Sequence, residues 1–288
     1  MLKVKLESLK KQGNAMKESL RELRTNIRFC GDDIKTILFT SVMPNEGKSS
    51  VVMDLAVSMV QAGNRVLVID TDMRKSVLVG RHKAKREDGG TIYGLSHLLS
   101  GQKELVDVVY ETQSSRLMVI FAGPAVVNPT ELLENAYFTK LINSVKKLFD
   151  YILIDCAPLG AAIDAAVVAK DCDGAIIVIS QGDVSSRSVV NVKQQLEASG
   201  VRILGAVLNK VDMHRNSYYG RYYGKYYGKY YGKYYGNENE SVKLKRKEQY
   251  KEKTIDQNAL KSASDEIFKL EYEETDAADE EVAADDGK

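Results

Sequence analysis

The sequence predicts an α/β fold with a doubly wound, mostly parallel sheet. Short apolar runs typical of buried strands recur along the first three quarters of the chain, and amphipathic helical patterns separate them. Strands that alternate with helices in this way pair in parallel, and helices cover both faces of their sheet. The composition, 44% hydrophobic and 28% charged residues, is ordinary for a globular protein and is compatible with one such domain.

Each element is predicted from its own pattern. Met16, Leu20, Leu23 and Ile27 lie at helical spacing on one face, so a first helix is expected up to about Cys30. The strands are expected at 37–40, 66–69, 117–121, 151–154, 175–180 and 203–208. Further helices are expected near 48–62, 130–148, 163–169 and 186–199, and glycines at 63 and 200 end two of them.

Composition shifts divide the chain into four parts. We expect an N-terminal extension at 1–14, a folded domain at 15–212, a Tyr-rich repeat at 213–236 and a charged, largely disordered tail at 237–288. Within the tail, residues 258–270 could form a transient helix. Inside the domain, residues 73–90 have little periodicity and many charges, which predicts a mobile loop.

The cysteines and the hydropathy pattern limit the cellular compartments in which the protein is expected. The chain has three cysteines without CxxC spacing, and this odd number argues against a disulfide framework and fits a reducing cytoplasm. There is no continuous apolar segment at the N-terminus and no run of eighteen apolar residues. We therefore expect neither export nor a membrane span, and expect any membrane association to depend on a partner.

A variant phosphate-binding loop occupies residues 41–50, after the first predicted strand. The ordinary pattern has Gly five residues before Gly47, and Val42 stands in that place. A Gly-Lys-Ser tripeptide alone could be a capped turn. Its place between a strand and an apolar helix favours phosphate binding.

The working end of this loop is present. Gly47 lets the backbone approach a phosphate, Lys48 supplies a positive charge, and Ser49 can bind magnesium at a helix N-terminus. Glu46 and Ser50 complete the predicted cofactor-binding loop.

Three carboxylates follow two of the predicted strands. Asp70 and Asp72 come after strand 66–69, and Asp155 follows strand 151–154. The carboxyl ends of parallel strands share one edge of a sheet, so these side chains can converge on a magnesium-nucleotide. A single Asp in such a place is more often a turn former or a helix cap.

A tyrosine repeat runs from residue 218 to 236 as five Tyr-Tyr-Gly units, the first four of which are each followed by Arg or Lys, and it holds ten of the sixteen tyrosines. Regularly spaced Gly costs about 1 kcal/mol per position in a helix, so an extended segment is expected. Four basic residues give it a charge of +4. The exposed hydroxyls, which another protein's active site could reach, belong to Tyr218, Tyr219, Tyr222, Tyr223, Tyr226, Tyr227, Tyr230, Tyr231, Tyr234 and Tyr235.

With these features the chain resembles the bacterial tyrosine kinases (BY-kinases) of polysaccharide export, within the deviant-Walker phosphate-loop ATPases. The resemblance covers about residues 15–236. Residues 44–49 are similar to the family's Walker A motif, 70–74 (Asp-x-Asp-x-Arg) to its second Walker motif, and 153–155 to its Walker B motif. The segment 128–133 is also family-like, but no chemistry is assigned to it.

The resemblance implies an ATP-dependent protein-tyrosine kinase that uses Mg²⁺ and phosphorylates its own tyrosine repeat. It makes Lys48 and Ser49 the phosphate and magnesium contacts, and Asp70 the base toward the tyrosine hydroxyl. The implied catalytic residues are Lys48, Asp70 and Asp72. The implied metal-binding residues are Ser49, Asp70, Asp72 and Asp155, and Arg74 and Asn209 join the loop in binding the nucleotide.

A polar stripe on the first helix, formed by Glu18, Arg21 and Arg24, matches the family's ExxRxxR motif. Periodicity alone makes it a solvated surface, whereas the resemblance implies a subunit contact. A head-to-tail contact that closes would form a ring, in which one subunit's tail reaches a neighbour's site.

The resemblance implies further partners and a location. They are a separate membrane-anchored activator and a cognate tyrosine phosphatase, which place the protein in the cytoplasm at the inner face of the membrane. The implied role is regulation of capsule or exopolysaccharide polymerisation and export.

The base of the nucleotide is ambiguous in the sequence. Asn209-Lys210-Val211-Asp212 reads as the guanine-specifying NKxD of GTPases, whereas an Asn at this place in deviant-Walker ATPases commonly meets adenine. We favour ATP.

Two other classes stay open. Tyr, Gly and basic residues in a repeat also suit RNA or single-strand binding, which the upstream domain makes the less favoured reading. A partitioning-type ATPase with a basic tether is the second, but Met43 stands where those ATPases carry a second lysine.

Overall fold

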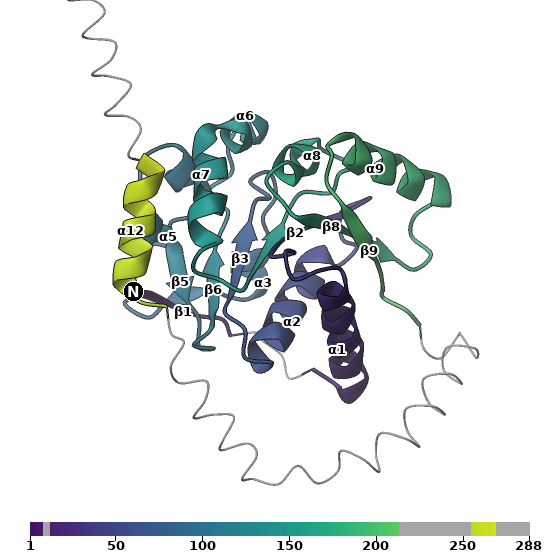
Figure 1. The fold of residues 1–288 in the computed structure, drawn as a ribbon, viewed down its shortest axis with the longest axis horizontal. Helices are drawn as coiled ribbons and strands as arrows, with labels where there is room; N and C mark the ends of the chain where they lie inside the picture. The colour runs from purple at the N-terminus through teal and green to yellow at the C-terminus, as the bar shows by residue number, and fades with distance from the viewer. Residues whose placement is uncertain (8–11, 213–254, 269–288) are drawn as a thin grey trace, which may run out of the picture.

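The computed structural model describes residues 1–7, 12–212 and 255–268 (Figure 1). The predicted tyrosine repeat and most of the predicted charged tail therefore lie outside the described residues. Its strands are β1 (Leu2–Lys5), β2 (Thr36–Ser41), β3 (Val66–Asp70), β4 (Lys85–Arg86), β5 (Val109–Glu111), β6 (Leu117–Ile120), β7 (Tyr151–Asp155), β8 (Gly174–Ser180) and β9 (Ile203–Asn209). Its helices are α1 (Asn14–Phe29), α2 (Lys48–Gln61), α3 (Leu78–Arg81), α4 (Leu95–Leu99), α5 (Leu105–Val108), α6 (Pro129–Glu134), α7 (Ala136–Val145), α8 (Asp164–Ala169), α9 (Ser186–Ala198) and α12 (Gln257–Phe268).

The strands form one sheet in the order β4-β1-β5-β6-β3-β7-β2-β8-β9. Every pair from β6 to β9 is parallel, whereas β5 runs antiparallel to β6 and β4 antiparallel to β1. The predicted mostly parallel α/β sheet is thus confirmed, and each of the six predicted strands is present. The inner strands β2 and β3 are buried along their whole length, as expected for nearly continuous apolar runs in a parallel sheet.

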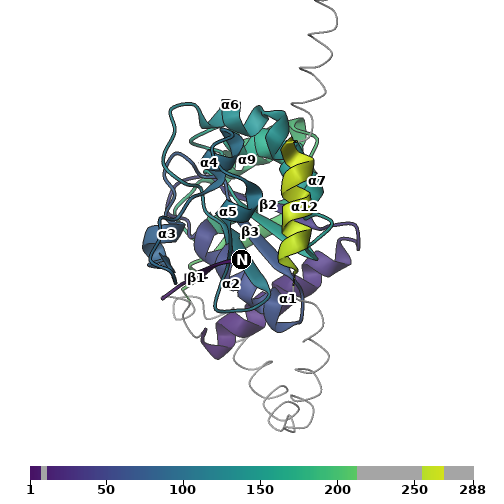
Figure 2. The ribbon, with the colours of Figure 1, turned by 90° about the vertical axis from the view of Figure 1, so that its left-hand side faces the viewer.

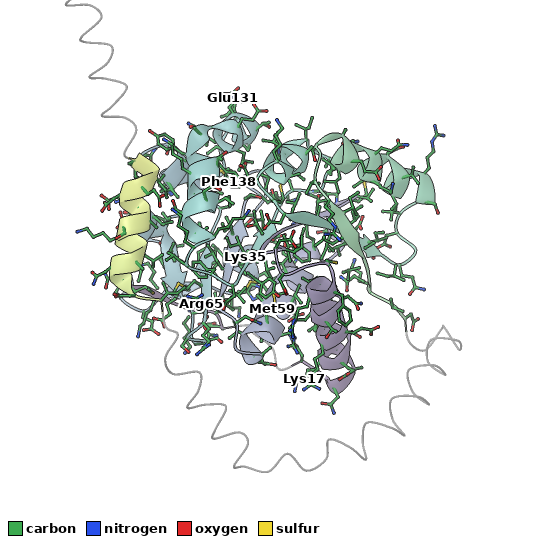
Figure 3. All side chains as sticks on the ribbon, viewed as in Figure 1. Lys17, Lys35, Met59, Arg65, Glu131 and Phe138 are labelled. Carbon is green, nitrogen blue, oxygen red and sulfur yellow. The ribbon has the colours of Figure 1, made fainter. Side chains whose placement is uncertain are left out.

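Helices cover both faces of the sheet and bury two separate clusters of apolar side chains. Met59 on α2 belongs to the cluster under α1 and α2, and Phe138 on α7 belongs to the cluster under α4 to α9 (Figure 3). This two-sided cover is the doubly wound arrangement that the sequence predicts. None of the described helices is long and apolar enough to cross a membrane.

Two helix predictions need correction. The helix expected over 130–148 is two helices, α6 and α7, because the backbone of Asn135 is extended (φ −63°, ψ 144°) and its side chain accepts a hydrogen bond from the Tyr137 N–H. On α1, Leu20 and Ile27 are buried as expected, but Met16 is 46% exposed. Met16 belongs to the first turn of α1, whose side chains are exposed throughout.

The fold extends beyond the predicted boundaries of 15 and 212. β1 pairs with β4 and β5, and it buries Val4 and Leu6. At the other end of the chain, α12 packs against α5 and α7 (Figure 2). The region predicted as a loop at 73–90 also contains regular structure, α3 and β4.

Candidate functional site

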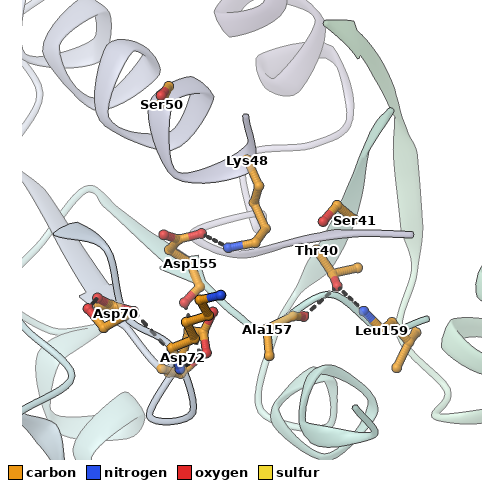
Figure 4. Close-up of polar contacts among 12 residues, drawn as sticks. Thr40, Ser41, Lys48, Ser50, Asp70, Asp72, Asp155, Ala157 and Leu159 are labelled. Atoms are coloured by element: carbon orange, nitrogen blue, oxygen red, sulfur yellow. Dashed lines mark hydrogen bonds and ion pairs between the residues drawn. The ribbon is translucent and has the colours of Figure 1, made fainter. Parts of the chain in front are cut away.

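The predicted phosphate loop connects β2 to α2, and α2 begins at Lys48 (Figure 4). Gly47 precedes the helix with φ 87°, in the left-handed region that favours glycine. A Cβ on Gly47 would lie 2.2 Å from Nδ2 of Asn209, so a larger residue would displace that side chain and also strain the backbone. The loop therefore delivers the N-terminal amides of a fourteen-residue helix to the edge of the sheet.

Glu46 and Asn209 hold the shape of this loop. The Glu46 carboxylate is buried and accepts hydrogen bonds from the N–H of Met43 (2.8 Å) and the N–H of Ser180 (3.2 Å). The Asn209 side chain donates to the carbonyl oxygen of Glu46 at 2.8 Å. In this structure both predicted nucleotide contacts brace the loop against β8 and β9.

Lys48 forms an ion pair with Asp155, and both side chains are buried (Figure 4). Burial acts to lower the pKa of Lys48, but the adjacent Asp155 carboxylate outweighs it and the pKa is raised. Lys48 is consequently a permanent positive charge at the carboxyl end of β7. Such a charge suits the binding of phosphate oxygens.

Asp70 is buried beside this pair. It lies opposite Asp155 in the register of β3 and β7, and it accepts hydrogen bonds from the Ser76 hydroxyl (2.6 Å) and the Asp72 N–H (3.1 Å). Burial, and next the charge of Asp155, raise the pKa of Asp70 to about 8. A carboxyl group with a pKa near neutrality is suited to proton transfer.

The three predicted carboxylates lie at the same edge of the sheet, on and just after β3 and β7. Within residues 1–7, 12–212 and 255–268, however, no three His, Cys, Asp or Glu side chains are arranged to hold a metal ion by themselves. Mg²⁺ in nucleotide sites commonly takes one or two protein ligands and completes its shell with phosphates and water. The donor set of Ser49, Asp72 and Asp155 beside Lys48 therefore fits a magnesium-nucleotide better than a bare metal ion.

Arg74 is engaged within the protein. Its guanidinium binds both oxygens of Asp164, at 2.6 and 2.8 Å, and the Thr130 hydroxyl donates to the same carboxylate at 2.7 Å. Burial acts to raise the pKa of Asp164, but the hydrogen bonds from Arg74 and Thr130 lower it. This network joins the loop after β3 to the first turns of α6 and α8. Sequence reasoning did not identify Asp164, and it placed Thr130 in the family-like segment 128–133 without assigning chemistry to it.

Ser50 and the Asn-Lys-Val-Asp motif at 209–212 also contact other residues of the chain. The Ser50 hydroxyl accepts a hydrogen bond from Arg81 of α3 at 2.7 Å, which brings a basic residue from the predicted loop to the start of α2. In the Asn-Lys-Val-Asp motif, Lys210 lies 3.6 Å from an Asp183 carboxylate oxygen, and the Asp212 N–H donates to the Gln181 side chain.

The stripe on α1 is only partly exposed. Glu18 and Arg21 form an ion pair of 3.3 Å at the surface. Arg24 is half-buried and donates to the carbonyl oxygen (2.6 Å) and hydroxyl (3.3 Å) of Ser58 on α2. Arg24 thus fastens α1 to α2, while the Glu18–Arg21 pair faces solvent.

The parallel sheet, the loop that opens α2 and the buried Lys48–Asp155 pair define a phosphate-loop nucleotide-binding protein. Comparison with known families agrees, since a family model described as an AAA domain matches residues 35–211.

Relatives and solved structures specify the family. The chain is 44% identical over 207 residues to "Tyrosine-protein kinase CpsD" of Streptococcus agalactiae serotype III, a match that covers 72% of this chain and 88% of that protein. It superposes on the kinase domain of Escherichia coli tyrosine kinase ETK with a TM-score of 0.61 and 29% identity, over 68% of this chain and 77% of that one. It superposes on the chimerical protein CapA2B2 with a TM-score of 0.62 and 31% identity, over 67% of this chain and 84% of that one. The chain belongs to the bacterial tyrosine kinases.

Proposed function

We propose that this protein transfers the γ-phosphoryl group of ATP to the tyrosines of its own repeat at 218–236. The observation that carries the proposal is the buried cluster of Lys48, Asp155 and Asp70 at the end of a phosphate loop, in a chain that also holds ten closely spaced tyrosines. Phosphoryl transfer needs positive charge on the phosphates, a metal ion and a positioned acceptor oxygen.

Each residue of the cluster has a defined task in this proposal. Lys48 and the N-terminal amides of α2 bind the phosphates, and Asp70 accepts the phenolic proton as the bond between the tyrosine oxygen and phosphorus forms. The bond between that phosphorus and the β,γ-bridging oxygen breaks, and ADP leaves with the electron pair. Ser49, Asp72 and Asp155 would hold Mg²⁺, which when bound neutralises charge on the phosphates.

Phosphorylation in trans within a ring is the arrangement that we favour. The repeat begins nine residues after Asn209, and a Gly-rich coil of 5 to 6 Å × √n reaches roughly 15 to 18 Å at Tyr218 and roughly 25 to 31 Å at Tyr235. These lengths permit either the chain's own site or a neighbour's. The surface pair Glu18–Arg21, together with Arg24, is the proposed subunit contact.

A mixing experiment distinguishes the two routes. Full-length Lys48→Met with an intact repeat serves as substrate, and an active copy with all ten repeat tyrosines changed to Phe serves as enzyme. Tyrosine phosphate on the Lys48→Met copy is the expected result. An unlabelled substrate copy, beside a wild-type chain that labels itself, would exclude the trans route.

We further propose that the kinase works with a membrane-anchored activator and a tyrosine phosphatase, peripherally at the inner face of the membrane, to regulate capsule or exopolysaccharide assembly. The support is membership of the bacterial tyrosine kinases, the family whose resemblance implies these partners and this role. ATP, rather than GTP, is the proposed nucleotide. Displacement of bound ATP by unlabelled GTP at equal concentration would overturn that choice.

A further inference from the structure

Helix α12 lies beyond the residues that the family model matches, which end at residue 211. It nevertheless packs on the domain, beside α5 and α7, in both views of the molecule (Figures 1 and 2). The described segment 255–268 contains α12, and the last described residue before this segment is Asp212, just after β9. β9 is one edge of the sheet, and α12 lies on the far side of the molecule from it (Figure 1).

One face of α12 is apolar and buried. Leu260, Ala263 and Ile267 recur at spacings of three and four residues, and they are 1%, 5% and 0% exposed. Next to them the Phe268 ring contacts the Tyr137 ring of α7, with 5.4 Å between centroids. Leu260, Ala263 and Ile267 belong to the apolar cluster under α4 to α9, and the Phe268 and Tyr137 side chains pack against it.

Polar contacts fix the register of α12 on this surface. The Ser264 hydroxyl accepts a hydrogen bond from the N–H of Leu105 at 3.1 Å, in a buried place. Leu105 is the first residue of α5, so α12 satisfies an amide that α5 cannot satisfy itself. On the rim, Lys147 pairs with Glu266 at 2.6 Å. Apolar packing alone would not require these two polar contacts, which fix one position of α12 along the surface.

We propose that the surface of α5 and α7 is a docking surface for α12 of the same chain, and that this contact holds the C-terminal end of the tyrosine segment on the kinase domain. Forty-two residues, 213–254, separate Asp212 from the described start of the α12 region. Extended, they could span roughly 140 to 150 Å, whereas a domain of this size has a radius of gyration of roughly 17 Å. The same-chain contact is therefore geometrically easy.

The consequence for the repeat rests on the proposed function. A chain fixed at both ends explores less space than a chain fixed at one end. For an ideal chain held at positions 212 and 255 instead of at 212 alone, the volume accessible to position 235 falls by about threefold. Docked α12 therefore keeps the acceptor tyrosines near their own domain, and release of α12 extends their reach to neighbours.

Hydrogen exchange on the full-length protein without nucleotide tests the docking. Ile267→Asp places a charge in the buried face, and Ser262→Asp places the same charge on the exposed face of the same helix as a control. Relative to wild type, exchange of α12 amides and of the Leu105 amide should accelerate by at least about tenfold in Ile267→Asp only. Equal, fast exchange of α12 in wild type and Ile267→Asp would overturn the proposal. Retained protection in β2 and β3 shows that the domain is folded.

A cross-link tests whether the contact lies within one chain. A carbodiimide joins Lys147 to Glu266 in an equal mixture of ¹⁴N- and ¹⁵N-labelled protein, and mass spectrometry reads the joined peptides. Peptides of a single isotope are expected, and mixed-isotope peptides would overturn the same-chain assignment.

The restricting role is tested in the mixing experiment described above. The Lys48→Met substrate copy is used with and without Ile267→Asp, and with Ser262→Asp as control. Ile267→Asp should raise the rate of trans labelling by about two- to threefold, and equal rates would overturn this role. If wild-type protein acquires no label at all, the kinase proposal fails, while the exchange and cross-link results still decide the docking.

Discussion

Removing Arg74 from the Arg74–Asp164 ion pair should lower the free energy of unfolding by more than removing Asp164. Asp164 is fully buried, whereas the Arg74 side chain is 42% exposed. Arg74→Met leaves a buried carboxylate with only the Thr130 hydroxyl, and removing one partner from a buried pair costs about 3 to 5 kcal/mol. Asp164→Asn leaves a guanidinium that can reach water, so the lost hydrogen bonds should cost only about 1 to 3 kcal/mol.

The double variant makes this test specific. With both charges removed, the penalty for the unpaired carboxylate disappears, so the double variant should be more stable than the sum of the single effects by about 1 to 3 kcal/mol. Urea unfolding of the nucleotide-free protein measures all four free energies, with the slope m as a check on two-state behaviour. Equal costs for the two single changes, together with an additive double variant, would refute the argument.

Three further predictions address the site and the assembly. Burial raises the pKa of Asp70 from 3.8 to about 8, so the free energy of unfolding falls as the pH rises between these two values. Asp70→Asn should therefore raise the Tm of the nucleotide-free protein more at pH 9 than at pH 5. An equal rise in Tm at both pH values would contradict this assignment. Glu46→Ala leaves the N–H groups of Met43 and Ser180 without their carboxylate acceptor, so it should lower the free energy of unfolding in urea by about 1 to 3 kcal/mol. Glu46→Gln keeps one acceptor oxygen and should lower it less. The reverse order would argue against a bracing role. Ten phosphates would change the net charge of the repeat from +4 to roughly −11 to −16. Light scattering should therefore show a lower particle mass after incubation with ATP, and phosphatase treatment should return the mass to its starting value. An unchanged mass would exclude charge-driven dissociation.

Much of the fold could be predicted because its central strands are buried on both faces. β2, β3 and β7 are apolar runs bounded by polar residues, and this pattern can be recognised from the residues of each strand alone. β1 was missed although Leu2, Val4 and Leu6 alternate with charged residues, the period of a half-buried strand, and that signal could have found it. The break at Asn135 was missed because an extended residue interrupts two helices whose apolar patterns run in phase.

The site divides in the same way. Gly47, Lys48 and the carboxylates are readable because a strand followed by a phosphate loop has a local signature. Asp164 lies ninety residues from Arg74 in the chain, and nothing local to it distinguishes a buried partner from an ordinary acidic helix start. The contacts of α12 are equally hidden, since an amphipathic pattern indicates a buried face but does not identify the surface that covers it.

In the proposed function, the Lys48 site phosphorylates the tyrosines at 218–236. Peptide mass spectrometry of full-length protein incubated with Mg-ATP, beside Lys48→Met checked for folding by its thermal transition, tests this most directly. We predict phosphate on the repeat tyrosines of the wild type and none on Lys48→Met. ATP hydrolysis with an unlabelled repeat, or equal labelling of both proteins, would contradict the claim.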